Sequence, residues 1–200
     1  MLENEYETIA WKSNKTVMGI DEAGRGPLCG PLVVACCVFP KNYSNDEIND
    51  SKKLTDKKRR KLFNIIVKDA LFYGIEIVPP KTIDKLNILE ATRSAMLKLS
   101  RKYDADYVIT DAVKIDNDKN IPIIKGDAKS ISIAGASILA KVVRDSIMDG
   151  YNVLYPEYEF NKHKGYPTKR HMELIHKLGV FDIYRFSYKP CQKCKFRILG

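Results

Sequence analysis

Three aspartates stand where short apolar segments end or begin, so their carboxylates could act together. Asp21 follows the apolar residues 17–20 and Asp111 follows 107–110, and each therefore closes a segment typical of a buried strand. Asp127 precedes a long apolar segment typical of a helix. Carboxylates brought together repel one another unless a cation lies between them, and such oxygen ligands suit Mg²⁺ or Mn²⁺. The pattern predicts a site for two ions that act on a phosphodiester, although aspartate is also a common turn residue after a strand.

Glu22 adjoins Asp21 and begins a loop rich in glycine. Because neighbouring residues of a strand point to opposite faces, the two carboxylates can share a site only if the strand ends or bulges there. Gly24 and Gly26 permit such a change and let backbone amides approach a ligand, while Arg25 between them can pair with a phosphate. The loop lacks the glycine spacing of nucleotide-binding loops, so a tight connection between two strands explains it equally well.

Other polar side chains are further candidates. Lys52 and Lys53 precede a predicted helix and are placed to contact phosphates, although lysines in such positions are usually only solvated. Asp145 competes with Asp127 for the fourth place among the acidic residues, with a surface ion pair as its alternative role. Cys191 and Cys194 have the spacing of half a zinc site, but the sequence has no second such pair, so we expect no metal there.

The charge balance favours an anionic partner. The chain has 34 Lys and Arg against 25 Asp and Glu, a net charge of +9, which suits nucleic acid better than a small substrate. No apolar stretch approaches the roughly 20 residues that span a bilayer, and the acidic start lacks the pattern of a signal peptide. Five cysteines without a disulfide framework favour reduced thiols, so we expect a cytoplasmic protein, and we expect it to be monomeric.

Hydrophobic periodicity predicts an α/β domain. We expect the first strands to form a meander and a helix before a later strand to form a parallel crossover, which gives a mixed five-stranded sheet flanked by helices. Residues 1–150 would form this core, and residues 151–200 a basic, helical C-terminal appendage that packs on the core and contacts substrate. The expected strands cover 17–21, 32–39, 71–78, 107–111 and 121–124, and the expected helices cover 57–68, 87–99, 131–148 and 168–179.

Six blocks of the sequence resemble the motifs of the ribonuclease HII family, the type 2 ribonucleases H. They fall in order between residues 19 and 168, so the resemblance extends across most of the chain. The related ribonuclease HIII carries an additional N-terminal domain, for which the sixteen residues before the first predicted strand leave no room, and this favours ribonuclease HII. The blocks are GIDEAGRGP at 19–27, DSKKL at 50–54, NIL at 87–89, KGD at 125–127, ASILAKVVRD at 136–145 and HKGYPT at 163–168.

The resemblance implies an RNase H-like fold and hydrolysis of the RNA strand of RNA–DNA hybrids. It also implies incision of duplex DNA on the 5′ side of an embedded ribonucleotide, as in ribonucleotide excision repair, leaving 3′-hydroxyl and 5′-phosphate ends. RNA–DNA hybrids and duplex DNA containing ribonucleotides are thus the expected partners. By the same resemblance, two Mg²⁺ or Mn²⁺ ions are held by the catalytic carboxylates of Asp21, Glu22, Asp111 and Asp127.

The substrate contacts of the family match four further positions. The resemblance assigns Gly24, Arg25 and Gly26 to reading the 2′-hydroxyl at the RNA-to-DNA junction, and Tyr166 to stacking on the deoxyribose that follows the ribonucleotide. The segment YRFSYKP at 184–190 only approximates the Arg-Arg-Ser-Phe motif of the family, which leaves the role of the tail open. From the residues alone, a non-catalytic binder of structured nucleic acid and a phosphoryl-transfer enzyme for a small substrate are the alternatives.

Overall fold

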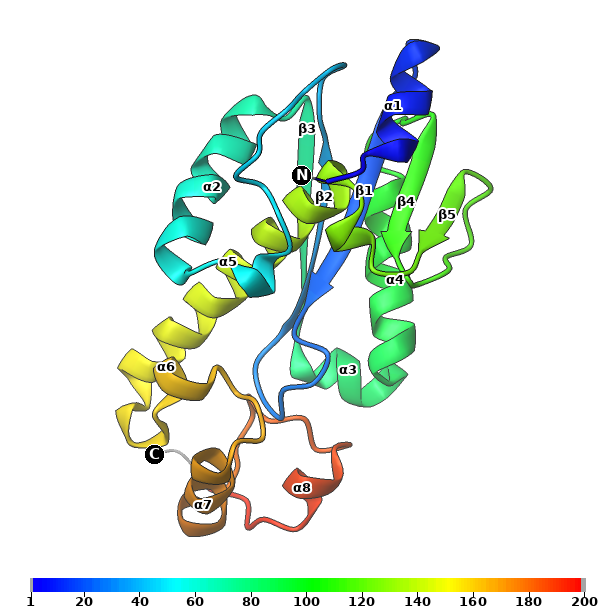
Figure 1. Cartoon of the computed structure of the whole chain (residues 1–200). Helices are drawn as coiled ribbons and strands as arrows, with labels where there is room; N and C mark the ends of the chain where they lie inside the picture. Colours follow the sequence, from blue (N-terminus) through cyan, green and yellow to red (C-terminus); the bar gives the residue numbers. More distant parts are fainter. Residues whose placement is uncertain (1, 199–200) are drawn as a thin grey trace.

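Five strands form one mixed sheet at the centre of the molecule, and the computed structural model describes residues 2–198 (Figure 1). The strands are β1 (Val17–Ala23), β2 (Leu32–Val38), β3 (Phe72–Val78), β4 (Tyr107–Asp111) and β5 (Asn120–Ile123). Their order in the sheet is β3-β2-β1-β4-β5. The first three pair antiparallel, whereas β4 is parallel to both β1 and β5. The predicted meander, parallel crossover and mixed sheet are therefore confirmed.

Helices connect the strands and make up most of the chain after the last strand. They are α1 (Glu5–Lys12), α2 (Asp56–Asp69), α3 (Pro80–Leu86), α4 (Ile88–Ser100), α5 (Ile131–Leu154), α6 (Phe160–His163), α7 (Lys169–Leu178) and α8 (Lys189–Gln192), with 3₁₀ turns η1 (Ser51–Lys53), η2 (Gly126–Ala128) and η3 (Pro156–Tyr158). Thr55 and Thr168 cap α2 and α7 through their hydroxyls. The sequence did not predict α1 or α3. In α3 the first residue is Pro80, and proline fits this position because its missing N–H needs no partner there.

The central strand β2 is buried on both faces. Val33, Ala35 and Cys37 pack with residues of α2 and α5, whereas Val34 and Cys36 pack with residues of α4 on the opposite face. Such a strand needs apolar residues at every position, which explains the continuous apolar run in the sequence. Figure 1 shows the resulting layers, with α2 and α5 on one side of the sheet and α4 on the other.

The backbone of helix α5 packs directly against the backbone of β1. A Cβ atom on Gly19 would lie 2.2 Å from the backbone carbon of Ser132, so only glycine fits at this position of the strand. The N-terminus of the helix is capped by Ser130, whose hydroxyl accepts a hydrogen bond from the backbone N–H of Ile133 at 3.1 Å. The start of α5 is thereby fixed beside the middle of β1.

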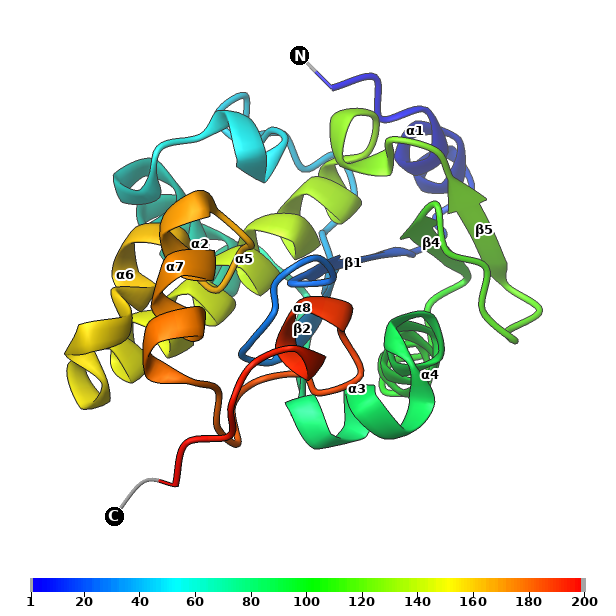
Figure 2. The same cartoon turned by 90° about the horizontal axis from the view of Figure 1, so that it is seen from below.

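The C-terminal segment has an aromatic cluster of its own and packs on the loop that follows β1. Tyr158, Phe160, Phe181 and Tyr184 are buried in this cluster together with Cys29 from the loop. Helix α5 runs without a break through residue 150 and supplies part of the same cluster. Figure 2, which views the molecule from this end, shows the loop enclosed by α7, α8 and α5. Across residues 2–198, none of the helices combines the length and the apolar character needed to cross a bilayer.

Candidate active site

Asp21, Asp111 and Asp127 lie together at one edge of the sheet. Asp21 is in the last part of β1 and Asp111 ends the parallel neighbour β4, so the two strands deliver their carboxylates to the same edge. Asp127 reaches this edge from the 3₁₀ turn η2. One carboxylate oxygen from each residue lies within 4.8 Å of the others, and no other group of three or more Asp, Glu, His or Cys among the described residues meets this criterion.

The protein balances the negative charges of this cluster only in part. Burial raises the pKa of Asp21 well above its usual value, and the charges of Glu22 and Asp111 raise it further. Burial is also the main cause of the raised pKa of Asp111, to which the charge of Asp127 adds. A cation between the carboxylates would reverse this effect because it stabilises their charged forms. A set of closely spaced carboxylate oxygens fits Mg²⁺ or Mn²⁺ by its chemistry.

Hydrogen bonds hold the three aspartates in place. The backbone N–H of Gly126 donates to Oδ1 of Asp111 at 2.8 Å, which ties the turn of Asp127 to the end of β4. The backbone N–H of Glu22 donates to Oδ1 of Asp21 at 2.7 Å, and this bond and the nearby side chain of Ser137 partly offset the raised pKa of Asp21. The hydroxyl of Ser137 lies 2.9 Å from that of Ser51, so α5 and η1 are linked directly behind Asp21.

Glu22 reaches the same pocket although the strand neither ends nor bulges there. Strand β1 continues through Ala23 in regular register with β2, which corrects the condition stated from the sequence. The described pairing of β1 with β4 ends at Ile20, so the next residues of β1 border the open edge. Glu22 stays outside the group of three aspartates, and its Oε1 lies 3.5 Å from Nη1 of Arg25. Its Oε2 is buried and has no hydrogen-bond partner among the described residues.

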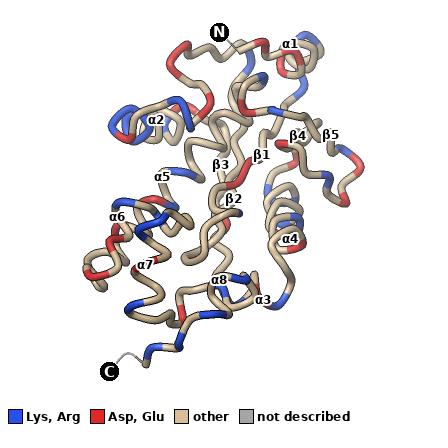
Figure 3. The backbone as a smooth tube through the Cα atoms, turned by 60° about the horizontal axis from the view of Figure 1, so that its bottom comes forward, with Lys and Arg blue, Asp and Glu red and all other residues tan. Residues whose placement is uncertain are grey.

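The aspartate edge opens into a pocket of about 610 Å³ that also contains the glycine loop. Lys52 extends over the acidic residues, with its Nζ 3.3 Å from Oδ2 of Asp127, whereas Lys53 is exposed and outside the lining. Figure 3 shows basic residues on α2, α5 and the C-terminal segment around the acidic ends of β1 and β4. The pocket is lined by Asp21, Glu22, Ala23, Gly24, Arg25, Gly26, Ser51, Lys52, Arg59, Asp111, Ser137, Lys141 and Tyr166.

A buried arginine from the tail fixes the glycine loop. The guanidinium of Arg185 donates to the carbonyl oxygens of Gly24 at 2.7 Å, Arg25 at 3.1 Å and Gly30 at 3.0 Å. The hydroxyl of Tyr188 donates to the carbonyl of Arg25 as well, at 2.7 Å. Because the carbonyls of Gly24 and Arg25 are thus occupied, the peptide groups of this turn are held in one orientation.

A second buried arginine supports the loop from α5. Arg144 donates to the carbonyl oxygens of Pro31 at 3.1 Å and Cys29 at 3.2 Å. It passes so close to Gly24 that a Cβ atom there would lie 2.2 Å from its Nε, and Gly24 has a φ of 104°, where side chains are strained. Only glycine therefore fits at this point of the loop.

Tyr166 borders the pocket and is held by two buried histidines. His163 accepts the backbone N–H of Gly165 at Nδ1 and donates from Nε2 to the carbonyl of Tyr158. His171 stacks on it with ring centroids 4.0 Å apart and donates from Nδ1 to the carbonyl of Tyr166 at 2.9 Å. Burial lowers the pKa of both histidines, that of His171 to about 4, so both are neutral at pH 7. The ring of Tyr166 itself is 40% exposed and free to meet a ligand.

Asp145, the competitor of Asp127, lies away from the three aspartates. It is buried, and its Oδ1 accepts from Nζ of Lys141 at 2.8 Å while its Oδ2 lies 4.0 Å from Nη2 of Arg59. Asp145 is thus the ionic partner of Lys141 and Arg59, two basic residues that line the pocket. The geometry places Asp127, and not Asp145, beside Asp21 and Asp111.

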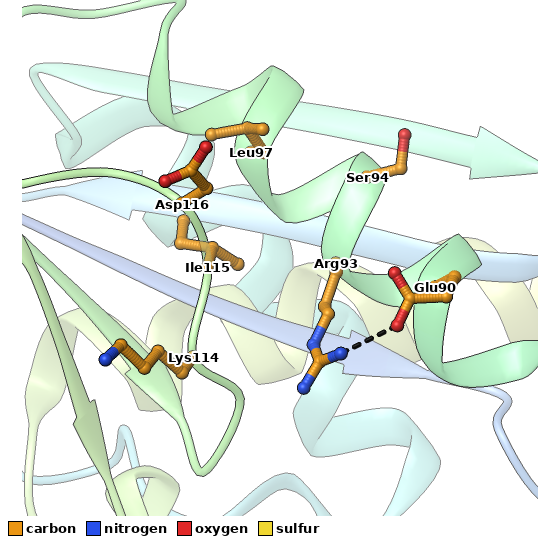
Figure 4. Close-up of a pocket in the computed structure, with 7 residues that line it drawn as sticks. All are labelled: Glu90, Arg93, Ser94, Leu97, Lys114, Ile115 and Asp116. Carbon is orange, nitrogen blue, oxygen red and sulfur yellow. Dashed lines mark hydrogen bonds and ion pairs between the residues drawn. The ribbon is translucent and has the colours of Figure 1, made fainter.

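Two other places in the structure do not bring together a comparable set of functional groups. A hollow of about 540 Å³ between α4 and the segment after β4 contains Arg93, Glu90 and Lys114, and Figure 4 shows Arg93 already paired with Glu90, 2.6 Å apart. Near the tail, the Sγ of Cys194 lies 3.9 Å from Nδ1 of His176, but no third ligand joins them among the described residues. Neither place offers a set of groups that could carry out chemistry.

Several residues that build the site could not be identified from the sequence. Ser137 and Arg144 belong to an apolar helix that reads as core, and Arg185 belongs to the tail segment of uncertain role. The available signal was Arg144, the one arginine of a largely apolar helix. A buried charge needs polar partners, and the partners of Arg144 are backbone carbonyls of the glycine loop. The partners themselves are distant in sequence, at separations of 113 to 161 residues.

Comparisons with known proteins agree on one family. The family model described as Ribonuclease HII matches residues 18–191 of this chain. A ribonuclease HII of Caldanaerobacter subterraneus subsp. tengcongensis is 53% identical over 176 residues, which are 86% of this chain and 73% of that protein. A ribonuclease HII of Aquifex aeolicus is 44% identical over 193 residues, which are 96% of this chain and 98% of that protein.

The structure also resembles solved structures. The crystal structure of the ribonuclease H2 from Pyrococcus horikoshii superposes with a TM-score of 0.74 at 28% sequence identity, covering 89% of this chain and 96% of that one. This likeness confirms the expected RNase H-like fold.

Proposed function

Because the chain belongs to the ribonuclease HII family of type 2 ribonucleases H, we propose that it hydrolyses the RNA strand of RNA–DNA hybrids and incises duplex DNA 5′ to an embedded ribonucleotide. The single observation that carries this proposal is that Asp21 and Asp111, which lie beside Asp127, line the same pocket as the fixed glycine loop. A hydrolytic centre beside a rigid backbone loop allows one enzyme to test for a 2′-hydroxyl where it cuts.

Asp21, Asp111 and Asp127 are the residues proposed to hold two divalent ions, Mg²⁺ or Mn²⁺, with Glu22 adding an oxygen. Divalent ions at such a site supply the positive charge for attack by water and for departure of the 3′ oxygen, which leaves 3′-hydroxyl and 5′-phosphate ends. The unpartnered Oε2 of Glu22 and the raised pKa of Asp21 both support this assignment. No side chain needs to act as a nucleophile.

The loop and Tyr166 are the proposed substrate-reading elements. Arg185 holds the peptide groups around Gly24, Arg25 and Gly26, so they can present fixed donors and acceptors to a 2′-hydroxyl, which both donates and accepts. The ring of Tyr166, 40% exposed on the same pocket, is placed to stack on the sugar that follows the ribonucleotide. Lys52 is the lysine oriented to meet a phosphate.

The decisive experiment incubates the protein with a labelled DNA duplex that contains one ribonucleotide, with Mg²⁺, with Mn²⁺ or with a chelator. We expect a single nick on the 5′ side of the ribonucleotide in either metal, and no nick with the chelator. A duplex of the same sequence without the ribonucleotide, and one with a 2′-O-methyl group at that position, are the controls. Cleavage of all three duplexes alike, or cleavage that persists in the chelator, would contradict the proposal.

A further inference from the structure

Glu7, in the N-terminal helix α1, is a completely buried carboxylate that is not part of the pocket lining. Its Oε1 accepts two hydrogen bonds at the start of α5, from the hydroxyl of Ser130 at 2.5 Å and from the backbone N–H of Ser132 at 3.1 Å. Its Oε2 is buried without a hydrogen-bond partner, and no salt bridge to it is formed among the described residues. Burying a charged group in this way is costly, so its contacts at the start of α5 must offset that cost.

The contacts of Glu7 satisfy two polar groups at the N-terminus of a long helix. Helix α5 has 24 residues, and the first backbone N–H groups of any helix lack partners within it. A carboxylate there is also favoured by the helix dipole. Glu7 therefore orients the capping hydroxyl of Ser130 and fixes the first turn of α5.

A neighbour in the same segment makes a second attachment. The backbone N–H of Asn4 donates to the carbonyl of Lys129 at 2.8 Å, and Oδ1 of Asn4 accepts from the backbone N–H of Ile131 at 2.8 Å. Together with Glu7, these bonds attach residues 129–132 to the N-terminal segment. Asp127 lies directly before this stretch.

Asp127 is thus held between two attachments. On its other side, the backbone N–H of Gly126 donates to the carboxylate of Asp111, and the carbonyl of Gly126 accepts from the backbone N–H of Ser130 at 2.9 Å. Lys125 enters this turn with a φ of 56°, in the left-handed region, which costs free energy for a residue with a side chain. A strained turn keeps its shape only while both ends are held.

We propose that Glu7 is a positioning residue of the metal site, which keeps Asp127 within reach of Asp21 and Asp111 by fixing Ser130 and the start of α5. This inference rests on the proposed function, because it takes Asp127 as a metal ligand. It assigns a task to the N-terminal helix, which none of the family blocks in the sequence includes.

The test measures Mn²⁺ binding to the whole chain without nucleic acid, from the electron paramagnetic resonance signal of free Mn²⁺. Glu7→Ala should weaken binding about 10-fold, the lower end of what is typical when a residue that orients a metal ligand is lost. Glu7→Gln keeps an oxygen that can accept both hydrogen bonds, so it should recover most of the loss. Glu5→Ala, an exposed glutamate of the same helix, is the matched control and should bind like the wild type.

A double-mutant cycle separates positioning from general stability. In an Asp127→Asn background, Glu7→Ala should have little further effect on Mn²⁺ affinity, although it lowers the melting temperature by the same amount in both backgrounds. An equal loss of affinity in both backgrounds, or no loss in the wild-type background, would overturn the inference. So would a Glu7→Gln variant that binds no better than Glu7→Ala.

These outcomes are distinct from failure of the proposed function. If the wild-type chain binds no Mn²⁺, or cuts a ribonucleotide in the chelator, the metal site itself is wrong. If the wild-type chain binds Mn²⁺ and Glu7→Ala binds it equally well, only the role of Glu7 is wrong. Should Glu7→Ala fail to fold, as judged by circular dichroism, Ser130→Ala, which removes the hydroxyl that donates to Glu7, takes its place in both backgrounds and should weaken Mn²⁺ binding only where Asp127 is present.

Discussion

The aspartate edge and the glycine loop border one pocket but differ in how completely the protein satisfies them. At the edge, burial and like charges raise the pKa values of Asp21 and Asp111, and the buried Oε2 of Glu22 has no partner in the described chain. In the loop, Arg185 and Arg144 hydrogen-bond to five carbonyl oxygens. The edge carries excess negative charge that a cation would neutralise, whereas these five carbonyl oxygens of the loop are paired before any ligand arrives.

This difference assigns separate tasks to the two regions. A cluster that lacks positive charge gains most from ions that enter and neutralise it, so its function depends on metal. A loop whose carbonyls are already paired keeps its shape with or without metal, so under the proposed function it would discriminate between sugars before metal binds. Changes at the edge should therefore affect metal binding and chemistry, whereas changes around the loop should affect substrate choice.

Replacing Asp111 should have the largest effect. Asp111→Asn removes one of the three converging charges, and a loss of about 4 kcal/mol of transition-state stabilisation corresponds to cleavage roughly 1000-fold slower in Mg²⁺. Duplex binding measured by fluorescence anisotropy in a chelator should be unchanged, because the loop is intact. Cleavage at the wild-type rate would remove Asp111 from the site.

Replacing Arg185 tests the other region. Lysine keeps the charge but lacks the planar fork whose two nitrogens reach the three carbonyls, so Arg185→Lys should cut kcat/KM at a single ribonucleotide by about 30-fold, corresponding to roughly 2 kcal/mol. The Mn²⁺ affinity of Arg185→Lys should stay at the wild-type value. The control is Arg170→Lys, which alters an exposed arginine paired with Glu159 and should leave both kcat/KM and Mn²⁺ affinity unchanged. Weakened Mn²⁺ binding by Arg185→Lys would show that the two regions are not separable.

Tyr166 should show an effect of substrate reading alone. Tyr166→Ala removes a stacking surface worth about 1–3 kcal/mol, so cleavage at a single ribonucleotide should fall by about 10-fold or more. Tyr166→Phe keeps the ring and should stay close to the wild type. The rates are measured under single-turnover conditions, and equal rates for all three proteins would exclude the stacking role.

As the pH falls, we expect the protein to be destabilised around the histidines that hold Tyr166 before the aspartate edge is affected. The pKa of His171 is lowered from 6.5 to about 4 in the folded protein, so the unfolded chain takes up the proton first as the pH falls. The stability that the neutral His171 contributes is therefore lost from about pH 6.5 downward. At pH 5 this loss in the free energy of unfolding amounts to roughly 2 kcal/mol.

The raised pKa values of Asp21 and Asp111 act in the opposite sense. In a chelator, they favour the folded state as the pH falls toward 3.8, because the folded protein then binds the proton more tightly.

Hydrogen exchange at the amides of Gly165 and Tyr166 between pH 7 and 5 checks the local effect at the histidines. Protection that stays constant over this range, after correction for intrinsic exchange, would contradict it.

Lys52 should give the smallest effect. If it contacts a phosphate, Lys52→Ala should lower the salt dependence of duplex binding by about one unit of slope, as expected for one lost contact. Lys53→Ala is the natural comparison because Lys53 is exposed and outside the pocket lining. Identical slopes for the two variants would leave Lys52 without a substrate role.

The sequence predicted the sheet well because its central strands β1, β2 and β4 are largely buried. Continuous apolar runs reveal such strands directly, and all five predicted strands overlap the observed ones. The helix α1 escaped prediction because only three of its residues, including Glu7, are buried, and a short helix with so few inward positions has little periodicity.

The site was predicted in part for a similar reason. The three aspartates stand out by residue type at strand and helix ends, and the family blocks add the loop and Tyr166. The parts that support them, Arg185, Ser137 and Glu7, depend on contacts between residues far apart in the chain, which residue type and local spacing do not encode. Residue identity was thus sufficient for the reacting groups but not for the groups that orient them.

The hydrogen bond from Arg185 to Gly24 joins residues 161 positions apart, and this has a consequence for a chain that is still being translated. The last aspartate, Asp127, leaves the ribosome well before Arg185 does. A nascent or prematurely terminated chain can therefore contain all three aspartates while the glycine loop still lacks its arginine. If the loop reads the sugar as proposed, such a product would lack the rigid turn on which that selectivity depends.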